Sequence, residues 1–589
     1  MALLAGERPS KVGNFALIDH EGKFHELDYE LKKPGVKGLF IFIHGNGCKL
    51  VEKRIDKLKE LRKEYEDKGI SFWMLNANRQ DNRAEICEAA VEFDTSILET
   101  AEDPAKPAIP ILIDDSQIVA QSLGVERTAE AYLISAKGKK IVYHGAIDDR
   151  LSYQADKPVA KNHYLKDAIN SLIAGEEIDP VATDAPGCKI TYPKFTEPLT
   201  YTRDIAPILA KNCLPCHTKG GLGPFSMSSY RKVAGWSDMM AEVIMTRQMP
   251  PWHADPEIGE FSNDCSLSTE EAHKIVTWIS AGSVKGEGPD PLLDFKPVIP
   301  KWHLGDPDHV IKLPAQIVAA KGVFKYRYVT LDNPFDSDVW LTATEIRPGN
   351  TSVLHHVIVT SHPADRAKDR RNEQWITGYA PGTQGQLYPE GSSVYLKKGH
   401  KLRFQLHYTA SGKENEVDYT QLGLHITKER TAKIFRTAIV AQRGLKILPG
   451  DANSEIPHSG YEYKDDIKDD KSDDDKFHPS HFFKKGATLY AINPHMHFRG
   501  KSMKFEAKYP GGNDQIFPLL SVPNYDFNWQ RTYVLKNPLK LPAGSRVYVR
   551  NAWDNSALNP HNPDPTKTVK WGDQTTEEMF FATLGYIED

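Results

Sequence analysis

The sequence predicts a protein of several domains: an α/β domain, a small all-α domain, and then two all-β sandwiches. The chain has 589 residues, which is too long for one hydrophobic core. Short apolar strands alternate with amphipathic helices in roughly the first 180 residues, and a helical region follows. The last ~290 residues hold short alternating strands with Gly and Pro at their joints, which is typical of β-sandwiches. The expected domains are 1–183, 184–290, 300–437 and 438–589, with a proline-rich linker, "GEGPDPLLDFKPVIPKW", before the sandwiches.

Composition and charge exclude several classes of partner. The chain has 74 basic and 79 acidic side chains, a net charge of −5, and nothing that favours nucleic acid or an anionic membrane. Its longest apolar runs, such as 38–43, are far shorter than the ~20 residues of a membrane helix, so no membrane span is expected. The N-terminal "MALLAGERPSKVG" is not a convincing signal peptide, so an exported protein would have its signal outside this chain.

The first domain is predicted from five strands and their helices. The helix after the first strand has one apolar face, and a last helix is expected at 164–174. The expected strands are 38–43, 70–76, 109–114, 131–135 and 140–144, and the apolar face is Val51, Ile55, Leu58, Leu61 and Tyr65. Over about residues 10 to 175, this order resembles the redoxin (thioredoxin-like) family.

The first domain departs from that family where thiol chemistry would occur. Cys48 in "HGNGCKL" has no Cys-x-x-Cys partner to resolve a mixed disulfide, and Gly45 replaces the hydroxyl residue of the peroxidatic pattern. Ala129 stands where redoxins place a cis-proline. A structural or docking role is therefore the favoured hypothesis, and thiol chemistry through Cys48, with Cys87 as a partner, is the alternative.

A haem-attachment motif lies in "DIAPILAKNCLPCHTKGG". Cys213 and Cys216 are one helical turn apart, so both thiols can add to the vinyl groups of one haem, and His217 then supplies the proximal imidazole. Cysteine and histidine are scarce enough that this spacing is rarely met by chance. The sequence thus predicts one covalently bound haem c, with a small zinc or redox site as the alternative.

The second axial ligand is expected in "RQMPPWHADP". Met249 is followed by two prolines that restrict the backbone beside its sulfur, and the segment resembles the methionine loop of class I cytochromes c. His253 is the alternative ligand, whereas Met239, Met240 and Met245 lie at helical spacing that favours core packing. The all-α domain should close with a helix that begins at the capping box of Ser268 and Glu271 and ends at Gly282.

Histidines recur in the last 290 residues. His355 and His356 lie side by side in the predicted strand "SVLHHVIVT", and His407 follows an alternating strand in "KLRFQLHYTASG". In "AINPHMHFRGKSM", His495 and His497 are two apart and would share one face of a strand. "WGDQTTEEMFFATLGY" carries Met579 at the start of a further strand. Each histidine could instead be a core residue bonded to backbone.

The order of these motifs resembles the copper type II, ascorbate-dependent monooxygenases, the family of peptidylglycine α-hydroxylating and dopamine β-monooxygenases. The resemblance spans about residues 302 to 589 and implies jelly-roll-like sandwiches with two copper ions on separate lobes across a solvent-filled gap. It implies an electron-transfer copper at His355, His356 and His407, and a catalytic, oxygen-binding copper at His495, His497 and Met579. Adjacent histidines can reach one ion only if their strand is bulged or twisted. His400, His425 and His561 match no ligand position.

Some features depart from that family. No cysteine follows Cys265, so the disulfides of the animal enzymes are missing, and Asn493 replaces the arginine that reads a substrate carboxylate. The substrate is therefore not expected to be a peptidylglycine. The acidic run in "YKDDIKDDKSDDDKFHPSHF" is interpreted as a solvated loop, with cation binding as the alternative.

Taken together, the motifs predict a periplasmic or secreted oxidoreductase that hydroxylates a substrate C–H bond with dioxygen, the haem feeding electrons to the two-site copper centre. Its partners would be dioxygen, a small-molecule or peptide substrate, and an external donor such as ascorbate or a redox protein. The alternative is a non-catalytic electron-transfer or copper-binding protein.

Overall fold

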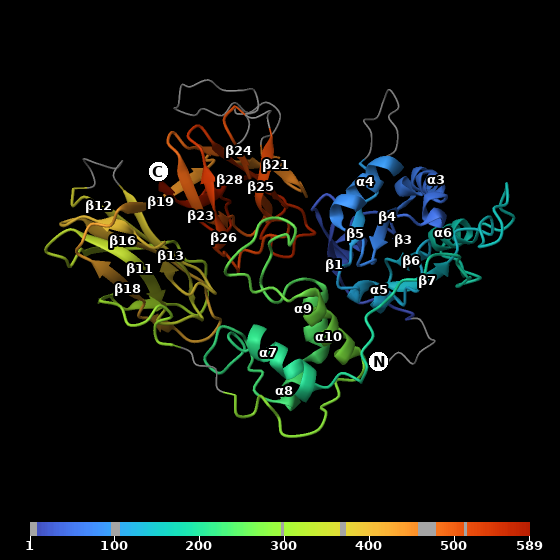
Figure 1. Ribbon diagram of the computed structural model, residues 1–589, viewed down its shortest axis with the longest axis horizontal. Coiled ribbons are helices and arrows are strands. Elements are labelled where there is room, and N and C mark those ends of the chain that lie inside the picture. Colours follow the sequence, from blue (N-terminus) through green and yellow to red (C-terminus); the bar gives the residue numbers. More distant parts are fainter. Residues whose placement is uncertain (1–8, 96–106, 296–299, 366–372, 457–478, 512–514) are drawn as a thin grey trace. The chain divides into compact units, whose positions relative to one another are not determined.

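The computed structural model describes residues 9–95, 107–295, 300–365, 373–456, 479–511 and 515–589 (Figure 1). The chain divides into two compact units. The first unit comprises Met1–Trp252 and Cys265–Pro297, and the second comprises His253–Asp264 and Val298–Asp589. The acidic run after residue 456 lies outside the described residues, so its interpretation as a solvated loop stays a prediction.

A seven-stranded sheet forms the centre of the first unit, in the order β2-β1-β5-β4-β3-β6-β7. The central β3, β4 and β5 are parallel, and β1 and β6 run antiparallel to their neighbours. The strands are β1 Ala16–Asp19, β2 Phe24–Glu26, β3 Gly38–His44, β4 Ile70–Asn76, β5 Ile111–Ile113, β6 Ala131–Ser135 and β7 Lys140–Gly145. All five predicted strands are present, and the α/β prediction for this part of the chain is confirmed.

Helices cover this sheet. The five residues of the predicted apolar face are all buried in one core with Phe40 and Met74, but the helix is interrupted between Glu52 and Ile55. The helices are α1 Leu27–Leu31, α2 Lys49–Glu52, α3 Ile55–Tyr65, η1 Glu66–Lys68, α4 Arg83–Phe93, α5 Ile118–Leu123 and α6 Tyr164–Ala174. The last helix has the predicted bounds.

A helical segment completes the first unit. Its elements are η2 Tyr201–Ile205, α7 Ala206–Asn212, α8 Tyr230–Gly235, α9 Ser237–Met245 and α10 Thr269–Ser280. The predicted capping box at the start of α10 is present, and Gly282 follows the helix with a φ of 91°. Met245 and Val276 share a core with Ile118 of α5, so the segment packs on the α/β sheet domain. Met240 is buried as predicted, whereas Met239 is 47% exposed and the core role expected for it is wrong.

The second unit is built from β-strands, and the prediction of a β-rich C-terminal region is confirmed. Its strands, from yellow to red in Figure 1, are β8 His309–Lys312, β9 Gln316–Val318, β10 Arg327–Asp332, β11 Val339–Arg347, β12 Leu354–His362, β13 Gln374–Tyr379, β14 Gln386–Leu387, β15 Ser392–Leu396, β16 Lys401–Tyr408, β17 Glu416–Asp418, β18 Gln421–Thr427, β19 Lys433–Ala441, β20 Lys446–Ile447, β21 Ser454–Ile456, β22 Ser480–Phe482, β23 Ala487–His495, β24 Gly500–Lys508, β25 Ile516–Val522, β26 Tyr533–Leu541, β27 Arg546–Trp553, β28 Val569–Lys570 and β29 Phe581–Glu588.

One long sheet runs through both halves of this unit. Its strand order is β26-β23-β29-β19-β15-β11-β18-β8, flanked by the four-stranded sheet β10-β16-β12-β13 and the five-stranded sheet built on β21-β27-β24-β25. β19 pairs with β15 on one edge and with β29 on the other. The boundary expected between residues 437 and 438 therefore falls inside a strand that joins the two halves. Jelly-roll-like topology stays a prediction.

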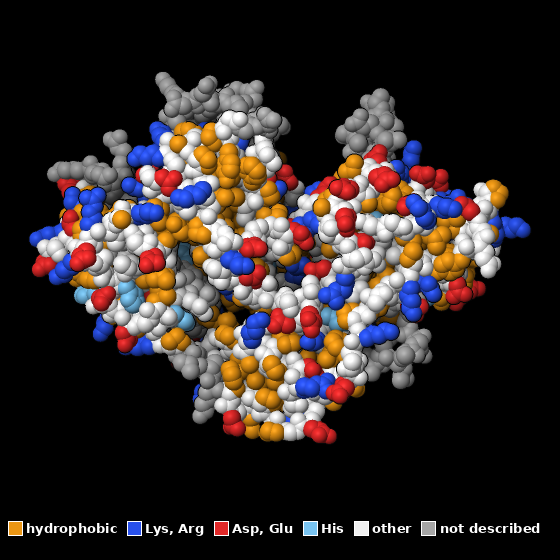
Figure 2. All heavy atoms as spheres, viewed as in Figure 1, with side chains coloured by type: hydrophobic (Ala, Val, Ile, Leu, Met, Phe, Trp, Pro, Cys, Tyr) orange, Lys and Arg blue, Asp and Glu red, His pale blue; other side chains and the backbone are white. Residues whose placement is uncertain are grey.

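The surface carries both signs of charge. Figure 2 shows basic and acidic side chains interspersed over the face in view, which agrees with the balanced composition. Within the described ranges, no helix combines the length and the apolar character needed to span a bilayer.

Candidate metal centre

The first histidine pair lies where β12 is irregular. β12 pairs with β16, and the register shifts between Leu354 and His356, so that His356 lies opposite His407. Residues on a regular strand alternate between faces, and a bulge is what allows two neighbours to turn toward one site. The predicted irregularity of this strand is confirmed.

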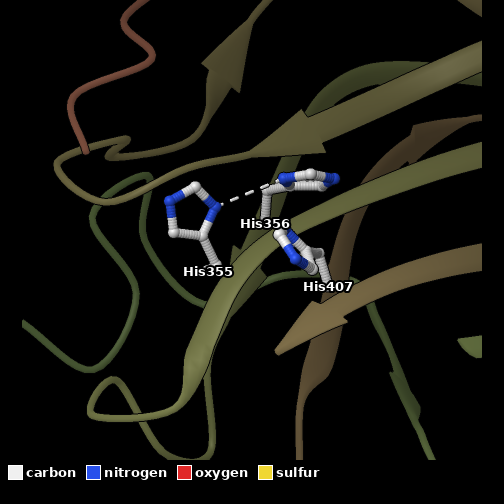
Figure 3. Close-up of side chains that lie close together, drawn as sticks. All are labelled: His355, His356 and His407. Carbon is white, nitrogen blue, oxygen red and sulfur yellow. Dashed lines mark hydrogen bonds between the residues drawn. The ribbon is translucent and has the colours of Figure 1, made fainter. Parts of the chain in front are cut away.

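Three imidazoles converge at this bulge (Figure 3). One nitrogen from each of His355, His356 and His407 lies within 4.8 Å of the others, and all three side chains are buried. The Nδ1 atoms of His355 and His356 are 3.4 Å apart. Nε2 of His355 and Nδ1 of His407 have no hydrogen-bond partner. Buried polar atoms normally have a hydrogen-bond partner, so these two unpartnered nitrogens are suited to bind a metal ion.

The three rings are neutral at ordinary pH. Burial, followed by the charge of neighbouring histidines, lowers the pKa of His355 to about 3 and that of His407 to about 4. The same causes hold the pKa of His356 well below its usual value. A histidine binds a metal only through an unprotonated nitrogen, so the cluster keeps its lone pairs available across physiological pH.

The second histidine motif lies at the end of β23. His495 is the last residue of that strand and His497 lies beyond it, so the expectation that both project from one strand is wrong. Their ring centroids are nevertheless 5.3 Å apart. Nδ1 of His495 lies 2.6 Å from Oε1 of Gln530, and Nδ1 of His497 lies 3.2 Å from the Glu577 carbonyl oxygen. Both contacts engage Nδ1 and leave Nε2 available, as in histidines that bind metals.

A buried carboxylate links His497 to Met579. The Glu578 carboxylate accepts backbone N–H groups from His497, at 2.9 Å, and from Met579, at 3.3 Å, and it also accepts the indole N–H of Trp553. Burial raises the pKa of Glu578 to about 7. Met579 is buried two residues before β29 rather than at its start. The sequence motifs predict no role for Gln530, and they include Glu578 beside Met579 without assigning it a role.

The two histidine motifs lie beside each other. The ring centroids of His356 and His495 are 6.0 Å apart, and Phe527 stacks on His355 at 4.4 Å while its edge meets His497 at 5.9 Å. The expected solvent-filled gap between the two sets is wrong for this structure. Five imidazoles and an aromatic ring form one cluster in the second unit.

The haem motif follows α7 in the first unit. The backbone N–H of His217 donates to the Cys213 carbonyl at 2.8 Å, so the motif is one turn of helix. Nδ1 of His217 lies 3.2 Å from the Phe225 carbonyl, which leaves Nε2 for iron. A Cβ at Gly223 would come within 2.7 Å of the His217 ring, so glycine is needed there. The two thiols and the imidazole fit a haem c; Met249 as its distal ligand stays a prediction, and the alternative, His253, belongs to the second unit.

A second thiol lies beside Cys48. The sulfurs of Cys48 and Cys188 are 2.9 Å apart, and the Thr128 hydroxyl is 3.1 Å from the Cys48 sulfur. The expectation that Cys48 has no partner thiol is therefore wrong. Cys87, the partner considered from the sequence, instead donates to the His20 carbonyl. Cys188 was missed because it follows the predicted α/β domain by several residues.

Comparisons with known proteins concern the first unit. No protein-family profile matches the chain. Proteins named thiol-disulfide oxidoreductase ResA, from Bacillus thuringiensis (strain Al Hakam) and from Bacillus anthracis, are each 28% identical over 130 residues, or 22% of this chain. The N-terminal α/β domain is similar to these proteins over that match. The match covers 64% of the length of these relatives.

Two solved structures are similar to part of the chain. A hypothetical protein from Sinorhizobium meliloti 1021 is 18% identical with a TM-score of 0.28, and covers 33% of this chain and 98% of its own. An uncharacterised conserved protein from Geobacillus kaustophilus is 23% identical with a TM-score of 0.27, and covers 32% of this chain and 94% of its own.

Proposed function

We propose that the second unit is a copper-dependent oxidoreductase that hydroxylates a substrate C–H bond with dioxygen. The observation that carries the proposal is the convergence of His355, His356 and His407 within 4.8 Å, with buried nitrogens that lack partners. Imidazole suits copper in both common oxidation states, and the thioether of Met579 favours Cu(I). His495, His497 and Met579 would hold the second ion, beside the substrate.

The chain's own residues keep the imidazoles of this centre neutral and oriented. Burial keeps the five imidazoles neutral, and Gln530 and the Glu577 carbonyl hold His495 and His497 in one ring orientation. Phe527 lies against both histidine sets, with its ring centroid 4.4 Å from that of His355 and 5.9 Å from that of His497. Copper would supply the binding and reduction of dioxygen. Ligands that are already neutral and oriented would need little rearrangement when a bound copper ion changed its oxidation state.

We propose in addition that Cys213, Cys216 and His217 would hold one haem c, with Met249 as a further iron ligand, and that the haem would supply one-electron chemistry with an external donor such as ascorbate or a redox protein. Haem c is attached outside the bacterial cytoplasm, so a periplasmic or secreted location goes with this proposal. Haem staining of a denaturing gel tests it. The double variant Cys213→Ser, Cys216→Ser should lose the stain, and Cys265→Ser should keep it.

Metal analysis of the purified protein, combined with a Cu(II) resonance spectrum, is the first test of the copper proposal. Two copper ions and one haem per chain are expected. Zinc at the histidines, or no metal, would contradict it. Dioxygen uptake that matches hydroxylated product one-to-one separates the oxygenase from an electron-transfer or copper-storing protein, which would consume no dioxygen with substrate.

A separate observation favours a second activity. The relatives of the N-terminal domain are named thiol-disulfide oxidoreductases, and this domain brings the Cys48 and Cys188 sulfurs to 2.9 Å. We infer that the first unit carries out thiol–disulfide exchange. Incubation of the reduced protein with oxidised glutathione should release two glutathione thiols per chain.

A further inference from the structure

A short segment beyond the α/β domain carries Cys188 back to Cys48. Arg127 and Lys189 form an antiparallel bridge, the Thr128 N–H donates to the Cys188 carbonyl, and the Ile190 N–H donates to the Glu126 carbonyl. This pairing fixes the backbone of Cys188 along the loop that precedes β6. The Cys188 sulfur is therefore already positioned beside the Cys48 sulfur, and the backbone need not rearrange to bring the two thiols together.

Small residues and a tyrosine make this approach possible. A Cβ at Gly187 would lie 1.7 Å from the Thr128 carbonyl oxygen, and a Cβ at Gly45 would lie 2.6 Å from the Thr128 methyl group. The Tyr153 hydroxyl donates to the Gly187 carbonyl at 2.7 Å and accepts the Gly187 N–H at 2.9 Å. The segments around Gly45 and Gly187 therefore meet at Thr128, and Tyr153 holds Gly187 in place.

The two sulfurs differ in access. Cys48 is 4% exposed at the start of α2, whereas Cys188 is exposed. Their separation of 2.9 Å is within about 1 Å of a covalent S–S bond. A solute can therefore reach Cys188 more readily than Cys48.

The two thiols also differ in acidity. Burial opposes the charged form of Cys48, but hydrogen bonds from the Cys188 thiol, the Thr128 hydroxyl and backbone N–H groups outweigh it and lower the pKa of Cys48. The hydrogen bond to Cys48, burial and the charge of Cys48 raise the pKa of Cys188. Cys48 is the better leaving group when a disulfide between them is cleaved.

We propose that Cys48 and Cys188 form a reversible redox disulfide, and that exchange with a low-molecular-weight thiol passes through a mixed disulfide on Cys188. The inference rests on the thiol–disulfide exchange proposed above and adds the residue pair, the point of entry and the class of reactant.

Two thiols reduce the Cys48–Cys188 disulfide in two stages. An incoming thiolate attacks the Cys188 sulfur, a bond forms between them, and the Cys48–Cys188 bond breaks with its electron pair left on Cys48. A second thiolate attacks the sulfur of the first reactant, which releases Cys188 as a thiolate that takes up a proton. Two thiols are oxidised to one disulfide, and the protein disulfide is reduced to two cysteines. The reverse sequence reduces an external disulfide.

Peptide mapping under non-reducing conditions tests the pairing. After oxidation of the full-length protein with oxidised glutathione, a cross-linked peptide pair containing Cys48 and Cys188 is expected, and it should persist in Cys87→Ser. Cross-links to any other cysteine, or glutathione retained on Cys48 in place of a cross-link, would overturn the inference while leaving thiol–disulfide exchange in place. Absence of any exchange would overturn both.

The point of entry is tested with single variants. Cys48→Ser should retain one glutathione on Cys188, and Cys188→Ser should react at Cys48 at least ten times more slowly, because Cys48 is buried. Far-ultraviolet circular dichroism of both variants shows that the fold is kept. Equal rates in the two variants, or a faster reaction at Cys48, would overturn the assignment of Cys188 as the point of entry.

Discussion

His356 and His495 belong to different histidine motifs, yet their ring centroids are 6.0 Å apart and the ring planes are perpendicular. The charge of His495 also contributes to the lowered pKa values of His355, His356 and His407. The two sets thus share one electrostatic environment. A change of charge at one set is expected to shift the pKa values of the other set, more strongly than across a solvent-filled gap.

Replacement of His356 by alanine should empty the first site. His356 lies at the centre of the cluster, with its ring 4.8 Å from that of His407, so its loss leaves two imidazoles that do not complete a copper site. Copper content should fall from two ions to one per chain. The exposed His561 matches no ligand position, and His561→Ala should keep both ions. If His356→Ala kept both ions, His355, His356 and His407 would not form a copper site.

Gln530 should act as a positioning residue for His495. Its Oε1 lies 2.6 Å from Nδ1 of His495, and loss of such a contact typically lowers metal affinity by about 10- to 100-fold. We expect Gln530→Leu to weaken Cu(I) binding by that order in a competition titration with a chromophoric chelator. Gln530→Glu keeps an acceptor oxygen for Nδ1 of His495 but loses the N–H donated to the Phe527 carbonyl, so its loss of affinity should be smaller than that of Gln530→Leu. Equal losses of Cu(I) affinity in Gln530→Leu and Gln530→Glu would indicate that the substitutions disturb the fold around the site, and not the contact with His495.

Met579 is expected to serve only one of the two ions. Its backbone shares the Glu578 carboxylate with His497, which places it at the second histidine motif. Met579→Ala should weaken Cu(I) binding at His495 and His497 and abolish product formation. Copper binding at His355, His356 and His407 and the haem spectrum should stay unchanged. Met239→Ala, at an exposed methionine, serves as the control. Simultaneous loss of both ions in Met579→Ala would contradict the division into two sites.

The Thr128 hydroxyl should set the acidity of Cys48. Its hydrogen bond favours the thiolate, so Thr128→Val should raise the pKa of Cys48 and shift the midpoint of its alkylation profile to higher pH. Below that midpoint the variant holds less thiolate and reacts more slowly. Thr128→Ser keeps the hydroxyl and should follow the native profile. The rate is read from iodoacetamide labelling of the Cys48 peptide at a series of pH values, and an unchanged midpoint in Thr128→Val would exclude the hydroxyl as a cause.

Local patterns determined several elements of the first unit. The period of apolar residues placed β4, β6 and α6 at their observed bounds, and the Ser268 capping box placed the start of α10. A metal site shared by His355 and His356 required a bulged strand, because neighbouring side chains on a regular strand point to opposite faces. These are short-range properties of the chain and can be read from neighbouring residues.

Tertiary structure alone decided which distant residues meet. The approach of Cys188 to Cys48 depends on a segment outside the α/β pattern and on the space that Gly187 leaves beside Thr128. The contact of His356 with His495 depends on β19, which joins the two halves of one long sheet, and on Phe527 from a loop between strands. No spacing in the sequence encodes such contacts, because they arise from how whole sheets and loops pack after their local structure has formed.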